Sequence, residues 1–388
     1  MKLLYPLLLA SALTVGAAAH AAPANTKSSA AAKARQVAAA EAKRLKLLRT
    51  RVTPRVDYAG EQVNFTQWQA VNDFADEIAL RHGIPRAELT ELIGKIRFIE
   101  SAIQLVRPPP VGKPKDMNGV RTLMIEPVRV NAGVKFWNEH AATLARAEAE
   151  FGVPAEIIVG IIGIETVYGR NTGRFRVLDV LATLAFAYPE TPNKEARMRF
   201  FRGELENALL LARTSNIDPF SMLGSFAGAI GMPQFMPSNV LAYGVDYDNN
   251  GQVDLRNSPT DVIGSVGNFL INHGWKRAEN GPLVYRAQLS EDRNLGGFLN
   301  QGLAAKFSID ALRAGGVGGD GAPAGQRLYG LVDLQNGKEA TEYWLATNNF
   351  FTITQYNRSY FYAMSVLELG AAVRDSRGSS ARASLGSL

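Results

Sequence analysis

The sequence has no cysteine among its 388 residues. This absence excludes disulfide bridges, thiol nucleophiles, cysteine zinc sites and lipid attachment through a cysteine, so we expect no lipoprotein. Charged residues are also few, at 20% of the chain against 46% hydrophobic residues, and this balance is typical of a globular protein. At roughly 100–200 residues per domain, the length predicts two or three domains.

One apolar run stands out, over residues 3–15, and it follows the basic Lys2. Small residues come next and end in the A-x-A pattern of residues 19–21. A charged start, an apolar middle and such a site predict a signal peptide over residues 1–21, cleaved at its end. The run is shorter than the ~20 apolar residues that span a bilayer, and an uncleaved anchor is the alternative. We therefore expect export to the periplasm.

The formal charge of +6 is concentrated in one segment. Lysine and arginine crowd residues 22–55, where Glu41 is the single acid, while acidic residues slightly outnumber basic ones from Val56 onward. A nucleic-acid-binding domain needs a basic patch on the fold itself, so we expect no nucleic acid partner. Residues 22–57 are predicted to be a basic tail, either a plain spacer or a segment attracted to an anionic surface.

Apolar residues at helical spacing dominate the rest of the chain. Together with the positions of glycine and proline, the pattern predicts helices over residues 66–82, 85–99, 134–151, 157–168, 178–188, 194–213 and 260–273, and towards the end of 348–369. Between residues 282 and 345, short β-prone pieces alternate with turn residues. The predicted fold class is α+β, mostly α, with an N-terminal helical domain and a small β insertion near the C-terminus.

The same pattern divides the chain into consecutive segments. We expect a helical domain over 58–150, a helical core over 151–280, a small β-rich subdomain over 281–346, a segment returning to the core over 347–372 and a flexible tail over 373–388. Gly316–Gly321 satisfies the G-x-G-x-x-G pattern of dinucleotide sites but lacks the strand before it and the helix after it. It is predicted to be a flexible loop.

Glu165 lies in an almost wholly apolar predicted helix. Burying a carboxylate without partners is costly, and burial raises its pKa. A carboxylic acid that is still protonated near neutral pH can donate a proton to a leaving oxygen, as cleavage of a glycosidic bond requires. The alternative is a structural glutamate paired with Arg170 or Arg174.

Two further stretches offer groups suited to a sugar. Residues 225–238 are dense in small residues and turn formers, and within them Ser225 and Gln234 carry neutral hydrogen-bonding groups. Residues 356–362 combine tyrosines with an asparagine, which suits the apolar faces and hydroxyl edges of sugar rings. A tight connection between helices and an ordinary aromatic core are the structural alternatives.

These motifs together resemble the B family of lytic murein transglycosylases. The resemblance rests on Glu165 with its flanks, residues 224–229, residues 234–238, Asp246-Tyr247-Asp248, residues 263–266, residues 273–275 and Tyr356-Asn357. The motifs occur in the family's order and extend from about Asn131 to Gly370. The sequence departs from the family at Phe269, where a groove tyrosine is frequent, and at Met232-Pro233, where a Tyr-Gly pair is familiar.

The resemblance implies a lysozyme-like core over residues 151–280 and an enzyme acting on peptidoglycan glycan strands. In such a family the glutamate corresponding to Glu165 is the lone acid and base. It protonates the glycosidic oxygen between N-acetylmuramic acid (MurNAc) and N-acetylglucosamine (GlcNAc). It then deprotonates the muramyl C6 hydroxyl, which attacks C1 and closes a 1,6-anhydro ring. The sequence offers no clear second carboxylate, although most glycosidases use two, and Asp179 is the nearest acid after Glu165.

The resemblance also implies roles for further residues. The matches predict substrate-binding roles for Ser225, Gln234, Phe235, Tyr356, Asn357 and Tyr362. Residues 246–251 begin like an EF-hand calcium loop, although Asn257 stands where the closing acid belongs. The predicted ligands of a structural Ca²⁺ are Asp246, Asp248, Asn250, Asp261 and the backbone carbonyl of Gln252. A turn that needs no ion is the alternative, and we expect no cofactor for the chemistry itself.

The leading prediction is therefore a periplasmic lytic transglycosylase that acts as a monomer on peptidoglycan, with other cell-wall enzymes as candidate partners. A hydrolytic muramidase that uses the same glutamate and a water nucleophile is the first alternative. A catalytically inert murein-binding protein is the second.

Overall fold

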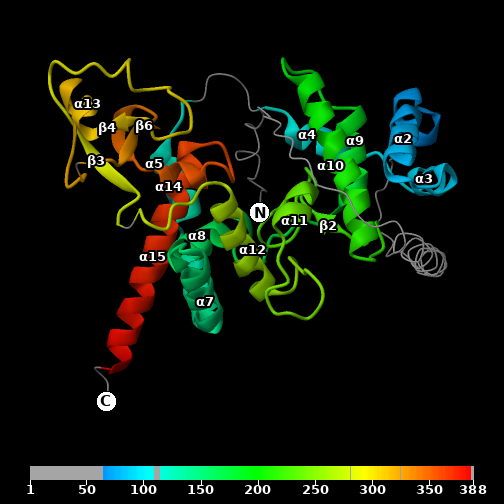
Figure 1. The fold of residues 1–388 in the computed structure, drawn as a ribbon, viewed down its shortest axis with the longest axis horizontal. Helices are drawn as coiled ribbons and strands as arrows, with labels where there is room; N and C mark the ends of the chain where they lie inside the picture. Colours follow the sequence, from blue (N-terminus) through cyan, green and yellow to red (C-terminus); the bar gives the residue numbers. More distant parts are fainter. Residues whose placement is uncertain (1–63, 109–113, 280, 324, 386–388) are drawn as a thin grey trace, which may run out of the picture. The chain divides into compact units, whose positions relative to one another are not determined.

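The computed structural model describes residues 64–108, 114–279, 281–323 and 325–385 (Figure 1). The predicted signal peptide and the predicted basic tail lie outside the described residues. Within the described ranges, no helix combines the length and the apolar character needed to cross a bilayer.

The described residues group into two compact units. Unit 1 comprises residues 106–173 and 230–385, and unit 2 comprises residues 64–105 and 174–229. The two units are interleaved along the chain, whereas the predicted segments follow one another. The predicted segment boundaries stay a prediction.

Unit 2 is built from helices and one short antiparallel strand pair. Its elements are η1 (Phe65–Gln67), α2 (Gln69–His82), α3 (Arg86–Ile93), α4 (Glu100–Val106), β1 (Phe175–Arg176), α9 (Val177–Phe186), α10 (Lys194–Thr214) and β2 (Leu223–Gly224). α2 ends at Gly83, whose left-handed φ of 63° a glycine adopts without steric cost. The helix predicted over residues 85–99 is shorter than expected, because α3 ends at Gly94 and the chain leaves the helix before α4.

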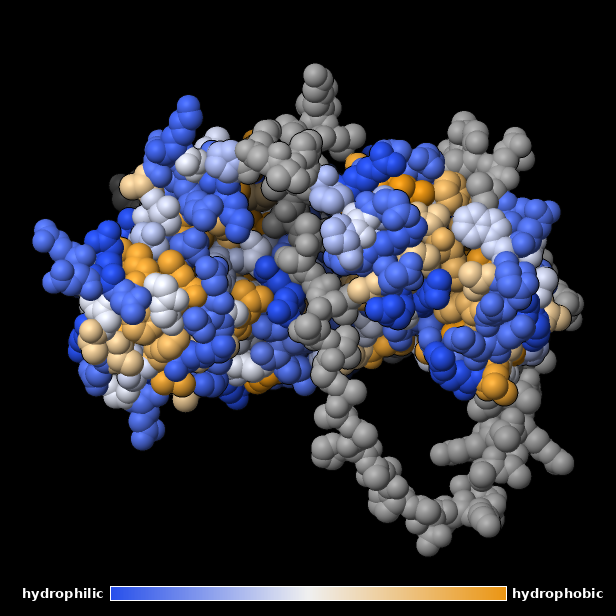
Figure 2. All heavy atoms as spheres, turned by 90° about the horizontal axis from the view of Figure 1, so that it is seen from above, coloured by the Kyte–Doolittle hydropathy of each residue, from blue (hydrophilic) through white to orange (hydrophobic). Residues whose placement is uncertain are grey.

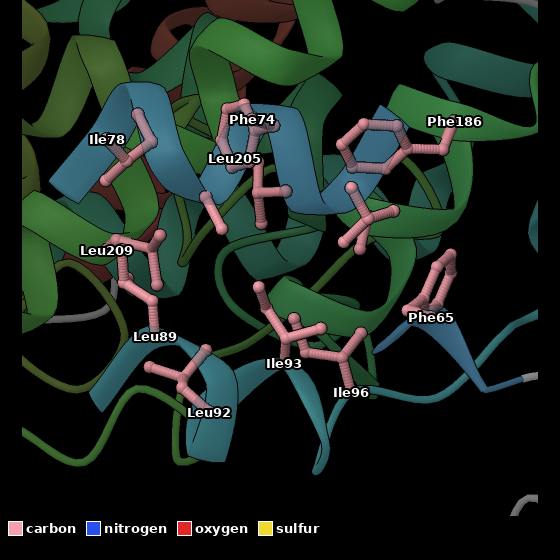
Figure 3. Close-up of a pocket in the computed structure, with 13 residues that line it drawn as sticks. Phe65, Phe74, Ile78, Leu89, Leu92, Ile93, Ile96, Phe186, Leu205 and Leu209 are labelled. Carbon is pink, nitrogen blue, oxygen red and sulfur yellow. The ribbon is translucent and has the colours of Figure 1, made fainter. Parts of the chain in front are cut away.

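Apolar side chains from α2, α3, α9 and α10 converge in the core of unit 2 (Figure 3). Phe65, Ile78 and Leu89 are almost fully buried there. The periodic apolar positions read from the sequence therefore face one another across this core. Removing this apolar surface from water is the main force that holds the short helices α2 and α3 in place.

Unit 1 contains the remaining helices. They are α5 (Met117–Met124), α6 (Pro127–Glu139), α7 (Ala141–Phe151), α8 (Ala155–Thr166), α11 (Pro237–Tyr243), α12 (Pro259–Asn272), α13 (Ile309–Ala314), α14 (Asn348–Ile353) and α15 (Tyr360–Leu385). The single helix predicted over residues 134–151 is two helices, because the backbone leaves the helical region at His140, where α6 ends and α7 begins.

α8 and α15 pack side by side in unit 1 (Figure 1). Two glycines permit the close approach. A Cβ atom at Gly160 would lie 2.3 Å from the Val366 carbonyl oxygen, and one at Gly370 would lie 2.3 Å from the Glu156 carbonyl oxygen. Larger residues at these positions would force the two helices apart.

α15 continues to Leu385, through residues that are predicted to form a flexible tail. The first residues of the predicted flexible tail (373–388) are docked instead. Val373 is fully buried, and Arg374 forms an ion pair with Glu156 at 2.8 Å. Tertiary contacts of this kind stabilise a helix whose composition alone predicts fraying.

The β insertion is confirmed as a five-stranded antiparallel sheet in unit 1, with strand order β4-β6-β7-β3-β5. Its strands are β3 (Val284–Leu289), β4 (Phe307–Ser308), β5 (Val317–Gly319), β6 (Leu328–Asn336) and β7 (Glu339–Ala346). β5 lies in the glycine-rich stretch predicted to be a loop, and that prediction was wrong. It becomes a strand by pairing with β3, where Gln288 faces Gly318. The fold is α+β and mostly α, as predicted.

Hydrophilic residues cover much of the face drawn in Figure 2, and apolar residues reach it in separate orange patches. Exposed apolar side chains include Leu80 on α2 and Val128 on α6. Scattered apolar side chains are normal on a protein surface and need no partner to explain them.

Candidate active site

Glu165 lies in the last turn of α8, among neighbours that are almost all buried. The sequence predicts that this helix runs to Tyr168, but it ends at Thr166, two residues earlier. The reason is that Val167 and Tyr168 both take left-handed φ values, 51° and 57°. Such values are rare for non-glycine residues and rarer still for a β-branched one, so the backbone directly after Thr166 is strained.

The Glu165 carboxyl group is held by one neutral donor. The Tyr362 hydroxyl from α15 donates a hydrogen bond to its Oε1 at 2.7 Å. Burial raises the pKa of Glu165 to about 7, although the hydrogen bond from Tyr362 acts in the opposite direction. Among the described residues no ion pair with Glu165 is found, and no arginine contributes to its pKa, so the alternative of a glutamate neutralised by Arg170 or Arg174 is not found. Glu165 can therefore carry its proton near neutral pH.

Aromatic side chains surround this carboxyl group. The rings of Tyr362 and Tyr356 stack with an interplanar angle of 14° and centroids 6.3 Å apart. Tyr356 also contacts Phe235 and Phe269, at centroid distances of 5.8 and 4.8 Å. Burial raises the pKa of both tyrosine hydroxyls well above the usual range, so both remain neutral donors. The structure thus brings together Glu165 and three of the predicted substrate-binding residues.

These three residues are not equally open to a substrate. Phe235 and Tyr362 are each only 1% exposed, whereas Tyr356 is partly exposed. Phe235 and Tyr362 are therefore core residues beside Glu165, and Tyr356 has more surface open to a ligand. The Tyr356 hydroxyl is engaged, because it donates to the Pro233 carbonyl oxygen at 2.6 Å.

Gln234 belongs to the turn that follows Gly231. Its own φ is left-handed at 51°, and its Nε2 donates to the carbonyl oxygens of Gly231 at 2.9 Å and of Thr172 at 3.3 Å. The side-chain nitrogen is therefore used to hold the turn. Its predicted contact with a substrate stays a prediction.

The other two predicted substrate-binding residues are Ser225 and Asn357. Ser225 belongs to unit 2, where its Oγ accepts hydrogen bonds from the backbone N–H groups of Ala227 and Ala229 at 3.4 and 3.1 Å. Asn357 follows Tyr356 and accepts a backbone hydrogen bond from Ser359 at 2.7 Å. Their roles toward a substrate stay predictions.

Asp179, the nearest acid after Glu165 in the sequence, is committed to structure. It is fully buried in α9 and forms an ion pair with Arg176 at 3.0 Å. Its Oδ1 also accepts the Arg97 backbone N–H at 3.1 Å. A carboxylate held in this way inside unit 2 is a structural group, so Glu165 keeps its position as the lone candidate acid.

A second cluster of acids lies in the predicted calcium loop. Asp246, Asp248 and Asp261 each place one carboxylate oxygen within 4.8 Å of the others. Like charges this close repel one another, and a bound cation removes the repulsion. Oxygen ligands of this kind suit Ca²⁺. The residues present therefore fit the ion that the sequence predicts.

Backbone hydrogen bonds shape the loop around this cluster. Asp246 accepts the Gly251 N–H at 2.7 Å, and Asp261 accepts backbone N–H groups through both of its oxygens. The Asn250 side-chain oxygen accepts the Gln252 N–H at 3.0 Å. The ligand roles of Asn250 and of the Gln252 carbonyl stay predictions.

The residues that connect Glu165 to its surroundings are not apparent from the sequence. Thr166 donates from Oγ1 to the Met232 carbonyl oxygen at 2.8 Å, and the neighbouring Pro233 carbonyl receives the Tyr356 hydroxyl. The available signal was a hydroxyl residue directly after the candidate acid in an otherwise apolar helix. Nothing in the sequence indicated which backbone groups it would meet.

A lone acid near neutral pKa at the end of a buried helix, lined by aromatic side chains, defines a lysozyme-like site with a single carboxyl group. The chain belongs to the transglycosylase SLT domain family, which matches residues 65–371. This confirms the resemblance inferred from the motifs.

Individual relatives agree with the family. The membrane-bound lytic murein transglycosylase B of Escherichia coli (strain K12) is 39% identical over 308 residues, which are 77% of this chain and 81% of the relative. The crystal structure of the soluble lytic transglycosylase SltB1 of Pseudomonas aeruginosa is 40% identical, with a TM-score of 0.72 over 80% of this chain and 99% of that one.

A third relative bears on the acid cluster. The Escherichia coli lytic transglycosylase Slt35 in complex with calcium is 37% identical, with a TM-score of 0.69 over 84% of this chain and 96% of that one. A related protein has therefore been solved with the ion that the loop of residues 246–261 is predicted to bind.

Proposed function

We propose that this protein is a lytic transglycosylase that cleaves the MurNAc–GlcNAc bond of peptidoglycan glycan strands and forms a 1,6-anhydromuramyl product. The observation that carries the proposal is the Glu165 carboxyl group, whose pKa of about 7 leaves it able to donate a proton near neutral pH. Membership of the transglycosylase SLT domain family supports the same activity.

Glu165 acts first as acid and then as base. Because Oε1 accepts the Tyr362 hydroxyl, Oε2 is left to carry the proton to the glycosidic oxygen as the bond to C1 breaks. The carboxylate that results takes the proton of the muramyl C6 hydroxyl, whose oxygen forms the new bond to C1. The substrate supplies its own nucleophile, so no water is consumed and one carboxyl group suffices.

The family resemblance and the geometry support further assignments. Ser225, Gln234, Phe235, Tyr356, Asn357 and Tyr362 bind or support the glycan. Asp246, Asp248, Asn250, Gln252 and Asp261 hold a structural Ca²⁺ that takes no part in the chemistry. The protein works as a monomer in the periplasm after removal of residues 1–21, with peptidoglycan as its partner.

Glu165→Gln tests the catalytic assignment. Because an amide cannot donate a proton to the leaving oxygen, we expect the variant to lose at least ~100-fold in activity on purified sacculi while remaining folded, with a melting temperature no lower than that of the wild type. Mass spectrometry of the wild-type digest should show anhydromuramyl ends. Reducing muramyl ends would identify a hydrolytic muramidase instead, and sacculus clearing by Glu165→Gln at the wild-type rate would show that Glu165 is not the acid.

A further inference from the structure

Thr166 is placed to control its neighbour Glu165. It is fully buried, and its Oγ1 donates to the Met232 carbonyl oxygen at 2.8 Å and accepts the Gly169 N–H at 3.1 Å. Neither bond belongs to the hydrogen-bond ladder of α8. The side chain therefore connects the end of the helix to the turn of residues 230–235, a segment more than 60 residues further along the chain.

That turn is a firm attachment point. Ile230 and Phe235 exchange both backbone hydrogen bonds, at 2.7 and 3.1 Å, and the Met232 N–H donates to the Leu255 carbonyl oxygen at 2.7 Å. Gly231 permits this approach, because a Cβ atom there would lie only 2.2 Å from the Leu255 oxygen. The turn is thus held by hydrogen bonds within itself and by one to Leu255, so the bond from Thr166 to Met232 restrains the end of α8.

The same turn is connected to Glu165 by a second route, through Tyr356 and Tyr362. The Pro233 carbonyl oxygen accepts the Tyr356 hydroxyl at 2.6 Å, Tyr356 stacks on Tyr362, and Tyr362 donates to Glu165 Oε1 at 2.7 Å. Glu165 is covalently joined to Thr166, which returns to Met232, the residue before Pro233. The contacts form a closed ring that starts and ends at the candidate acid.

We propose that Thr166 is a positioning residue that holds the Glu165 carboxyl group in its productive orientation through the turn of residues 230–235. The proposal rests on the proposed function of Glu165. The physical reason for a positioning role is the strained backbone after Thr166. Val167 and Tyr168 keep their left-handed φ values only if surrounding contacts enforce them. Without the Oγ1 bonds the end of α8 relaxes, and the carboxyl group moves relative to Tyr362.

Thr166→Val removes the Oγ1 bonds to Met232 and Gly169, and the longer one to the Ile162 carbonyl oxygen at 3.4 Å, at almost unchanged volume. We expect kcat on soluble glycan strands to fall by up to ~100-fold, the scale of an ångström misplacement of a catalytic group, with KM changed less than twofold. Thr166→Ser keeps the hydroxyl and should restore kcat to within about threefold of wild type.

Thr183→Val is the matched control. Thr183 is also fully buried, donates to a carbonyl oxygen at 2.8 Å and accepts a backbone N–H at 2.9 Å, but it lies in α9 of unit 2. It should lower the melting temperature as much as Thr166→Val does and leave kcat unchanged. If both valine variants reduce kcat equally, or if Thr166→Val keeps wild-type kcat, the proposal is overturned.

Tyr356→Phe tests the second route between the turn and Glu165. It removes the hydrogen bond to the Pro233 carbonyl oxygen and keeps the aromatic side chain that stacks on Tyr362. The double variant with Thr166→Val should lose no more activity than the worse single variant, whereas two independent residues would give multiplied losses. Should Thr166→Val fail to fold, wild-type kcat in Tyr356→Phe would refute the proposal and a reduced kcat would support it. Full activity in Glu165→Gln would instead refute the proposed function.

Discussion

Glu165 shows how one side chain obtains a pKa suited to acid catalysis. Burial at the end of α8 raises its pKa, and the Tyr362 hydroxyl limits the rise while fixing the orientation of one oxygen. A neutral donor does this without the large downward shift that a paired arginine would cause. The choice of tyrosine as the partner therefore preserves the acid.

The raised pKa has a consequence for stability. An unfolded glutamate titrates near 4.5, whereas folded Glu165 titrates near 7, so between these values the folded state binds more protons and wild-type stability falls as pH rises. Above pH 7 the folded protein carries the full cost of the buried charge, which glutamine lacks. We expect Glu165→Gln to gain about 2–5 °C more in melting temperature over wild type at about pH 8 than at about pH 5.

Differential scanning calorimetry of both proteins across this pH range checks the expectation. A difference in melting temperature that stays constant from about pH 5 to about pH 8 would show that the pKa of Glu165 is not raised.

At the scale of the element, the loop of residues 246–261 combines a strong internal framework with an unfavourable concentration of charge. Asp261 is fully buried at the start of α12, where Ser258 caps the helix by accepting its N–H. Asp246 and Asp248 bring further negative charge within 4.8 Å. The loop is shaped by hydrogen bonds, but it gains stability when a cation neutralises these three groups.

Calcium should therefore raise the melting temperature of the wild-type protein, because an ion that binds the folded state adds RT ln(1 + [L]/Kd) to stability. At ~100-fold excess over Kd this amounts to about 2.7 kcal/mol. Asp246→Ala should abolish the response, and Asp76→Ala, an exposed acid on α2, should keep it. A wild-type melting temperature that is indifferent to both calcium and a chelator would rule out the site.

At the scale of the molecule, Arg121 joins distant parts of unit 1. From α5 it forms ion pairs with Glu342 on β7 at 2.6 Å and with Glu368 on α15 at 2.8 Å. The hydrogen bond from Arg121 is the main reason that the pKa of Glu342 falls to about 2. These two ion pairs connect β7 of the sheet to the helices α5 and α15 of the same unit, and all three side chains are mostly shielded from solvent.

Arg121→Met should lower the free energy of unfolding by about 2 kcal/mol at neutral pH, since it removes the ion-pair partner of Glu368 and the more buried of the two arginine partners of Glu342. Arg286→Met is the matched control, because Arg286 pairs with the same Glu342 at 3.0 Å but is 53% exposed, and it should cost at most about 1 kcal/mol. Urea unfolding at neutral pH measures both values.

The sign of the pH dependence follows from the lowered pKa of Glu342. The stability that ionised Glu342 contributes is fully present above its unfolded-state pKa of about 4.5. It is lost as pH falls towards its folded-state pKa of about 2. The stability gap between wild type and Arg121→Met should narrow over this range. A gap that does not change with pH would contradict the assigned role of the ion pair.

The sequence by itself determined much of the local structure. Most predicted helices are present, because apolar periodicity and end signals such as Gly83 act within a few residues of the chain. Glu165 stood out for the same local reason, as a carboxyl group in an apolar helix. The acid-rich loop was also recognisable, since Asp246, Asp248 and Asp261 are close in sequence as well as in space.

The tertiary structure alone decided what depends on distant partners. β5 is a strand because it pairs with β3, and Val373 and Arg374 in the predicted tail are docked on the unit through contacts with distant segments. The left-handed end of α8 and the bonds of Thr166 likewise depend on a turn that lies far along the chain. Local propensities cannot encode such contacts, because their free energy exists only once the separate segments have packed together.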